Sequence, residues 1–138
     1  MFGMTKKQFL KKSKNCLKES GIQLLLIREI FNSEIKGEIN FDETNNKVDK
    51  IRKNLEDIFF KYESLKPPSK CKSLQLEIMK TLIILQDVLV LNSEYIILSK
   101  DGSKMEGQEK FEKSIDELEN FRNKFRKLSQ KVDLYLRQ

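Results

Sequence analysis

The sequence predicts an all-α protein, folded as an up-down-up-down antiparallel four-helix bundle with long helices. Three observations support this prediction. Of the 138 residues, 35% are charged, and only five are glycine and two proline. This composition suits long amphipathic helices better than a β-sandwich, which needs frequent turns. Apolar residues recur at helical spacing, and three breaks divide the chain into four segments of helical length.

The breaks set the expected helix boundaries. Pro67-Pro68 interrupts the middle of the chain, because proline cannot continue a helix and restricts the residue before it. A turn signal lies at 101–103 and a weaker break at 37–42. A long helical hairpin, or a three-helix core with a peripheral first helix, would also fit, although short connections favour antiparallel neighbours. We expect one domain, 1–138, with helices at about 5–36, 42–65, 69–99 and 105–136.

Three of the four segments carry one apolar stripe each, as expected for helices with a single buried face. Gly21 lies inside the first segment and weakens the helix prediction locally. The stripes consist of Phe9, Cys16, Leu17, Leu24, Ile27, Phe31 and Ile35 in the first segment, Val48, Ile51, Leu55, Ile58, Tyr62 and Leu65 in the second, and Phe111, Ile115, Leu118, Phe125, Leu128, Val132 and Tyr135 in the fourth.

The third segment is apolar on nearly all sides. At about 100° per residue, two apolar rows with a spacing of seven fall opposite its first stripe. One interpretation is a homo-oligomer that packs this helix against its copy, as in coiled coils. The other is that this is simply the most buried helix of its own bundle. The first stripe is Ile78, Leu82, Leu85, Leu89 and Ile96; the rows opposite are Leu76, Ile83, Val90 and Ile97, and beside them Ile84, Leu91 and Leu98.

The sequence predicts a cytoplasmic protein that does not span a membrane. The most apolar stretch, 81–98, is about membrane length, but polar residues such as Asp87 and Glu94 interrupt it. The N-terminus has no apolar run of signal-peptide length. Cys16 and Cys71 have no CxxC spacing, and we interpret both as ordinary thiols.

Positive charge is concentrated near the two ends of the sequence. Residues 1–20 and residues 120–138 each carry a net charge of +5, whereas the whole chain carries +6. In the predicted topology both stretches meet the 65–72 connection at one end, which predicts a basic pole that attracts anions. The predicted pole consists of Lys7, Lys11, Lys14, Lys70, Lys72, Arg122, Arg126, Lys127 and Lys131. The opposite end is predicted to carry Glu34, Glu38, Asp42, Glu43 and Asp101.

No residue pattern predicts catalysis. The chain has no histidine, the commonest general base and metal ligand. It lacks GxSxG, GxxxxGK[ST] and GxGxxG. Glu112 and Asp116 are helical neighbours, but without histidine they do not make a di-iron site, and a solvated face is the better interpretation. We therefore expect no enzyme activity, no catalytic residues, no metal and no cofactor.

The order of features resembles a group of small, uncharacterised all-helical proteins of low-GC Gram-positive bacteria and their phages. The resemblance implies four helices and no particular activity. Members often carry tryptophan late in the first helix, where this chain has Asn32, and a Pro-Ser-Gly-Ser turn, where it has Asp101-Gly102-Ser103. The features that carry the resemblance are Cys16-Leu17, Leu65-Lys66-Pro67-Pro68, Tyr95, the turn at 99–103 and Phe111.

Three functions fit these features. The first is a non-enzymatic helical binding or interaction protein, oligomeric through its third helix and, from the resemblance, phage- or prophage-encoded. The second is a sequestering protein that binds an anionic nucleotide signal of a bacterial defence system. The third is nucleic-acid binding through the basic pole, for which there is little support because few aromatic residues lie among the lysines. Phe9, Phe121 and Phe125 are the candidates, and we expect all three in the core.

Overall fold

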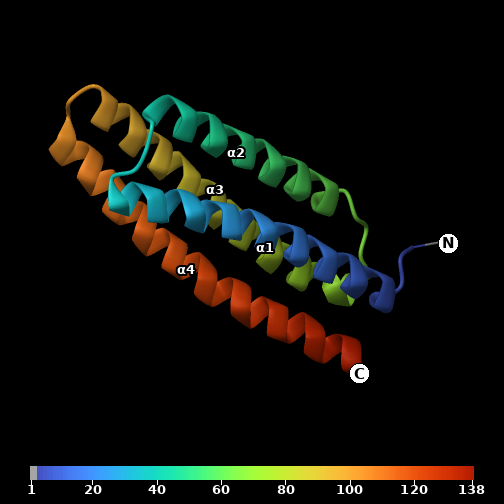
Figure 1. Ribbon diagram of the computed structural model, residues 1–138. Coiled ribbons are helices and arrows are strands. Elements are labelled where there is room, and N and C mark those ends of the chain that lie inside the picture. The colour runs from blue at the N-terminus through green and yellow to red at the C-terminus, as the bar shows by residue number, and fades with distance from the viewer. Residues whose placement is uncertain (1–2) are drawn as a thin grey trace.

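The computed structural model describes residues 3–138 and contains four long helices that lie side by side (Figure 1). It has no strand within this described range, so the prediction of an all-α protein with four helices is confirmed. The helices are α1 (Lys6–Lys36), α2 (Phe41–Glu63), α3 (Lys72–Lys100) and α4 (Lys104–Arg137), with a short 3-10 turn (Ser69–Cys71) before α3.

Local sequence explains where α1 begins and ends. Thr5 and Gln8 form a capping box, in which the Thr5 hydroxyl accepts from the Gln8 N–H at 3.1 Å and the Gln8 side chain accepts from the Thr5 N–H at 2.9 Å. At the other end Gly37 adopts φ 72°, a conformation that costs little only for glycine. The N–H of Glu38 then reaches back to the carbonyl of Ser33 at 3.0 Å, which closes the helix.

The connection between α2 and α3 is longer than the sequence predicted. α2 ends at Glu63 rather than near 65, and α3 begins at Lys72 rather than near 69. The two prolines keep the chain extended, and the first residues after them form the 3-10 turn instead of the α-helix. Gln75 fixes this connection because its amide donates to the carbonyls of Tyr62 (3.2 Å) and Leu65 (3.1 Å).

The inward faces of all four helices form one apolar core. α1 contributes Phe9 and Ile27, both fully buried, so it is not a peripheral helix. Two residues of the predicted buried stripes are not buried: Ile35 is 66% exposed and Ile115 is 38% exposed. Ile35 points outward because Glu34, one residue earlier, takes the inward position in the last turn of α1. The largest fully buried side chains are Phe9, Phe121, Ile27, Leu55, Ile78, Leu82, Leu85, Leu89, Ile96, Val48, Val88 and Val132.

α3 and α4 pack most closely. At the start of α4, Gly107 is buried against the last turns of α3, and a Cβ atom placed on it would lie 3.4 Å from the carbonyl oxygen of Tyr95. Further along, ion pairs link Glu94 to Lys110 at 2.8 Å and Glu77 to Lys131 at 3.2 Å. Both helices therefore remain in contact over most of their length.

One helix of the described range, 69–100, is long and apolar enough to cross a membrane by length and composition alone. The central helix of a water-soluble protein often has the same properties. Here one side of α3 faces the core of the protein. Its residues Ile78, Leu85 and Ile96 are each 2% exposed or less. The apolar character of α3 is thus in part the character of a core helix.

Candidate functional site

The outer face of α3 carries a row of exposed apolar side chains. Leu76, Ile83, Val90 and Ile97 are 54%, 48%, 37% and 52% exposed. They share one face of α3, because positions seven apart fall only about 20° short of two full turns, and this face points away from the buried stripe. The structure therefore places this predicted row outside the chain's own core, and α3 is not buried on all sides.

The neighbouring predicted row has a different environment. Ile84, Leu91 and Leu98 are half-buried, and Ile84 packs against the core. Leu98 lies beside the start of α4, with its Cβ 3.5 Å from the position that a Cβ of Gly107 would take. This second row therefore contributes to the packing of α3 within the chain as much as to its outer face.

The two ends of the helical region meet at one end of the molecule (Figure 1). The ammonium of Lys6 lies 5.4 Å from the centre of the Tyr135 ring, which links the first turn of α1 to the last turn of α4. α3 also begins at this end, with Lys70 and Lys72 exposed before and at its start. We call this region the basic end: the start of α1 with Lys7 and Lys11, the 66–72 segment, and α4 from Lys127 onward.

The nine predicted basic residues do not form one patch. Arg122 lies fifteen residues before the end of α4, about 22 Å along the helix. Its guanidinium pairs with Glu119 at 3.2 Å, and that of Arg126 donates to Asn123 at 3.0 Å. Arg122 therefore belongs to the middle of α4 rather than to the basic end, whereas Arg126 lies at the border between the two.

Two further residues of the predicted pole are engaged in ion pairs between helices. Lys14 pairs with Asp133 at 3.1 Å and Lys131 pairs with Glu77 at 3.2 Å. Both pairs are substantially exposed, so their charges remain accessible to solvent and contribute little to stability. Their net effect is to lower the positive charge of the α1–α4 and α3–α4 seams.

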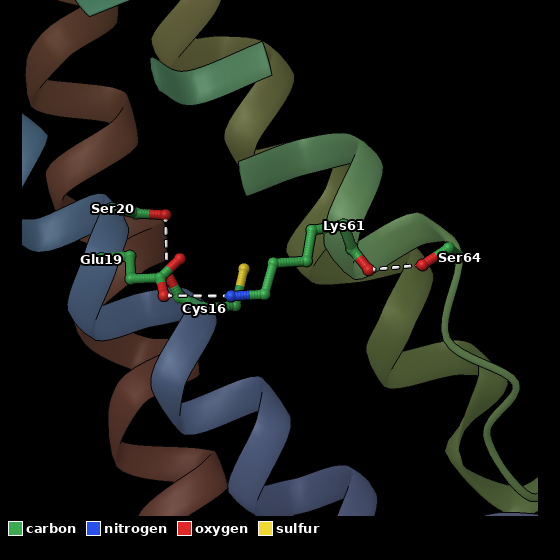
Figure 2. Close-up of polar contacts among 5 residues, drawn as sticks. All are labelled: Cys16, Glu19, Ser20, Lys61 and Ser64. Carbon is green, nitrogen blue, oxygen red and sulfur yellow. Dashed lines mark hydrogen bonds and ion pairs between the residues drawn. The ribbon is translucent and has the colours of Figure 1, made fainter. Parts of the chain in front are cut away.

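The seam between α1 and α2 is more open and polar than that between α3 and α4. Near the basic end it contains a pocket of about 240 Å³, lined among others by Lys12, Glu19, Lys61 and Ser64. Figure 2 shows how Lys61 reaches across from α2 to Glu19 of α1, at 3.4 Å. Sequence reasoning missed this pocket, because its two lysines belong to separate helices that only the fold brings together.

Larger hollows continue along the same seam. A pocket of about 410 Å³ lies between the last part of α1 and the first part of α2, lined by both apolar and charged side chains, including Leu26, Ile51 and Lys47. Between the two pockets the Asn54 amide donates to Gln23 at 3.2 Å. Polar as well as apolar side chains therefore line this seam.

The most unusual polar group of the structure is Glu34. The sequence predicted it as one of the charges of the acidic end, and this prediction is wrong because the side chain is buried. It is only 6% exposed and points inward, where its Oε1 accepts from the Asn92 amide of α3 at 2.7 Å. Glu34 Oε2 and Asn92 Oδ1 are both buried and have no hydrogen-bond partner among the residues described. Burial raises the pKa of the Glu34 carboxyl from 4.5 to about 7, although the Asn92 hydrogen bond opposes this effect.

The remaining titratable groups near the core do not form a reactive constellation. Cys16 and Cys71 are buried free thiols, and burial raises the pKa of Cys16 to about 12, which keeps it protonated. The Tyr62 hydroxyl lies 2.8 Å from that of Ser13, and burial raises its pKa as well. Within residues 3–138 no group of three acidic or cysteine side chains is placed to hold a metal ion.

No protein-family model matches the chain, and searches of curated proteins and of solved structures also give no match.

Proposed function

We propose that this protein is a non-enzymatic helical binding protein, an up-down-up-down antiparallel four-helix bundle that works as an assembly of copies joined through the outer face of α3. The observation that carries the proposal is the row Leu76, Ile83, Val90 and Ile97, four apolar side chains between 37% and 54% exposed on one helix. Single exposed apolar residues are common, whereas a continuous apolar row usually marks an interface.

The spacing of the row favours a helical partner. A repeat of seven residues keeps apolar side chains facing a second helix in a left-handed supercoil. Completing the burial of one half-exposed Leu, Ile or Val side chain yields about 1 kcal/mol, so two copies gain about 8 kcal/mol from this row. Association costs about 4–15 kcal/mol. Self-association through this face is therefore expected to be weak and to depend on protein concentration.

The test is the mass in solution, measured by light scattering or sedimentation up to about 500 µM. We expect a mass above the 16.3 kDa of one chain at the highest concentrations. Ile83→Glu should return the protein to a single chain, because it places a charge in the centre of the row. Leu134→Glu is the matched control, since Leu134 is 55% exposed on α4. A wild-type protein that remains a single chain throughout would overturn the proposal.

A second candidate function is the binding of a small anion, such as part of a nucleotide, in the pocket between Lys12 and Lys61. The specific observation is that this pocket of about 240 Å³ lies beside the basic end and is lined by Lys12 and Lys61. Glu19 lines it as well and pairs with Lys61 at 3.4 Å, so an anion would have to compete with this carboxylate. Its volume is below the range of about 300–1,000 Å³ typical of drug-sized ligands. It would therefore hold a phosphate with part of a sugar rather than a whole nucleotide.

A thermal-shift screen against nucleotides tests this second function, because a ligand that binds only the folded state raises its stability. We expect Lys12→Ala and Lys61→Ala to reduce the shift, whereas Lys53→Ala, an exposed lysine of α2 outside the pocket, should leave it unchanged. Absence of any shift across the panel would reject nucleotide binding. Binding of DNA that weakens steeply with salt would instead assign the basic end to nucleic acid.

A further inference from the structure

On the outer face of α3 the charges change sign along the helix. Lys72 and Lys80 are exposed in its first half, whereas Asp87 is exposed and Glu94 half-exposed in its second half. Glu77 and Lys100 have the opposite signs, but they lie further round the helix and pair with Lys131 and Asp42 of the same chain. Lys80, Asp87 and Glu94 follow Leu76, Ile83 and Val90 by four residues each. They therefore form a charged row about 40° from the apolar row, on the same outer face. Any helix that covers the apolar row also meets these charges.

We propose that the occupant of this face is the α3 helix of a second copy, running antiparallel to the first. The inference rests on the proposed self-association and adds its orientation. Pairing the apolar rows about their midpoint, between residues 86 and 87, sets Leu76 against Ile97 of the second copy and Ile83 against Val90 of the second copy. This register also brings Lys80 within one turn of Glu94 of the second copy, and twofold symmetry makes that attraction twice. Glu94 pairs with Lys110 of its own chain at 2.8 Å, so Lys80 would join an ion pair that is already present.

The opposite orientation is disfavoured by the charge of the whole molecule. A parallel pair would set two basic ends side by side, with Lys70 and Lys72 of both copies close together. Their separation across two packed helices, about 10 Å, is near the Debye length at physiological salt, so the repulsion is only partly screened. The antiparallel pair avoids this repulsion and also opposes the dipoles of the two helices. Two unfavourable contacts accompany it. The two Asp87 side chains approach the axis, and Lys72 comes within one turn of Lys100 of the second copy, whose charge is partly offset by Asp42 at 2.6 Å.

The antiparallel arrangement determines what the assembly presents to its surroundings. α3 contains 29 residues and is about 44 Å long. The two basic ends therefore lie at opposite extremities of the pair, separated by roughly the length of one helix. An assembly of this shape can contact two anionic partners at once, one at each extremity.

Disulfide trapping tests the orientation. The native cysteines do not interfere, because Cys16 and Cys71 are 6% and 4% exposed. We expect a chain carrying Leu76→Cys, mixed with one carrying Ile97→Cys and oxidised with diamide, to migrate largely as a covalent pair. Leu76→Cys alone should not cross-link, since its copies are about 31 Å apart in the antiparallel register. Ile83→Cys mixed with Val90→Cys repeats the test at the centre, and Leu134→Cys is the control for random collision.

The outcomes separate this inference from the proposed function. Cross-linking of Leu76→Cys to itself would show a parallel pair, which overturns the orientation and leaves self-association intact. A wild-type mass above one chain without cross-linking in either mixed pair would place the interface elsewhere. A wild-type protein that is a single chain at all concentrations overturns the proposed function and this inference together.

Charge reversal gives an independent test of the proposed pairing between Lys80 and Glu94 of the second copy. Lys80→Glu should weaken self-association about fivefold, because it converts two exposed attractions into repulsions. Lys53→Glu makes the same change of charge on α2, away from the α3 row, and should have no comparable effect. Equal weakening by both variants would mean that only net charge matters, which would contradict the proposed pairing of Lys80 with Glu94.

Discussion

Glu34→Gln is expected to stabilise the folded protein by about 3 kcal/mol near pH 8 and to have little effect near pH 4.5. In the wild-type protein, a carboxylate at this position is buried with one hydrogen bond from Asn92. Glutamine has nearly the same shape and carries no charge. Its amide also provides a donor for Asn92 Oδ1, which otherwise lacks a partner among the described residues.

The same argument predicts the pH dependence of the wild-type protein. The pKa of Glu34 is about 7 in the folded state and 4.5 when the carboxyl is solvated. Between these values the folded protein binds more protons than the unfolded chain, so its free energy of unfolding falls as the pH rises. The loss accumulates between pH 4.5 and pH 7 and reaches about 3 kcal/mol above it.

The neighbours of Glu34 do not offset its charge. α3 contributes Asn92 and Tyr95, and the pKa of Tyr95 is itself raised, first by burial and then by the charge of Glu34. No ion pair to Glu34 is present among residues 3–138. Burial therefore favours the neutral form, and a proton on Oε2 would also supply a donor that this pair of side chains lacks.

Urea unfolding followed by circular dichroism, repeated from about pH 5 to pH 8, measures both effects. Glu38→Gln is the matched control, because Glu38 is exposed four residues further along the chain. We expect the stability of the wild type and of the control to fall with pH, and that of Glu34→Gln to change much less. Parallel profiles for all three proteins would show that Glu34 does not titrate in this range.

Gly107→Val is expected to destabilise the fold by about 3 kcal/mol, because the site has no room for a branched side chain. A Cβ on Gly107 would lie 2.9 Å from the Ser99 hydroxyl, 3.4 Å from the Tyr95 carbonyl and 3.5 Å from the Leu98 Cβ. The hydroxyl can rotate away, but the carbonyl belongs to the backbone of α3. The two further carbons of valine would therefore push α4 away from α3.

Alanine at the same position is the informative control. Gly107→Ala adds one carbon and gains about 1 kcal/mol of helix propensity, which offsets the displacement of the Ser99 hydroxyl. In a Ser99→Ala background that displacement disappears, so Gly107→Ala should be stabilising there. Equilibrium unfolding of the four proteins, wild type, each single variant and the double variant, gives the coupling directly. A destabilisation by Gly107→Val equal to that of Gly107→Ala would show that the helices separate freely here.

The periodicity of the sequence correctly indicated most buried positions. The stripe from Ile78 to Ile96 is buried along its length, as expected. For the row from Leu76 to Ile97 the sequence allowed either burial or exposure, and the structure leaves it exposed. The turn at 101–103 is also as expected, with Gly102 at φ 87°. Such features depend on neighbours within one or two helical turns, so they can be read from the chain itself.

The Glu34–Asn92 pair could not be predicted in the same way. The two residues are 58 positions apart, and each is an ordinary polar residue in its own segment. A partial signal was present, because Asn92 follows Leu85 by seven residues and Glu34 follows Phe31 by three, on inward faces. Their hydrogen bond nevertheless depends on how α1 approaches α3, and the raised pKa depends on the water that this approach excludes.

The charge pattern was likewise predictable from the sequence only in part. Net charges at the two ends of the sequence were evident, and the start of α1 does lie beside the end of α4. Charge summed along the chain could not place Arg122, whose position midway along α4 removes it from the basic end. Nor could it find the pocket between Lys12 and Lys61, which belongs to two helices.

The sequence by itself determined four helices, the approximate positions of their breaks and most of their inward faces, because hydrophobic spacing and turn residues act locally. Only the tertiary structure decided that the outer row of α3 is left uncovered by the chain's own helices, that Glu34 is buried beside Asn92 and that the α1–α2 seam is open. These properties arise from contacts and from exclusion of water between segments distant in sequence, and no local pattern specifies them.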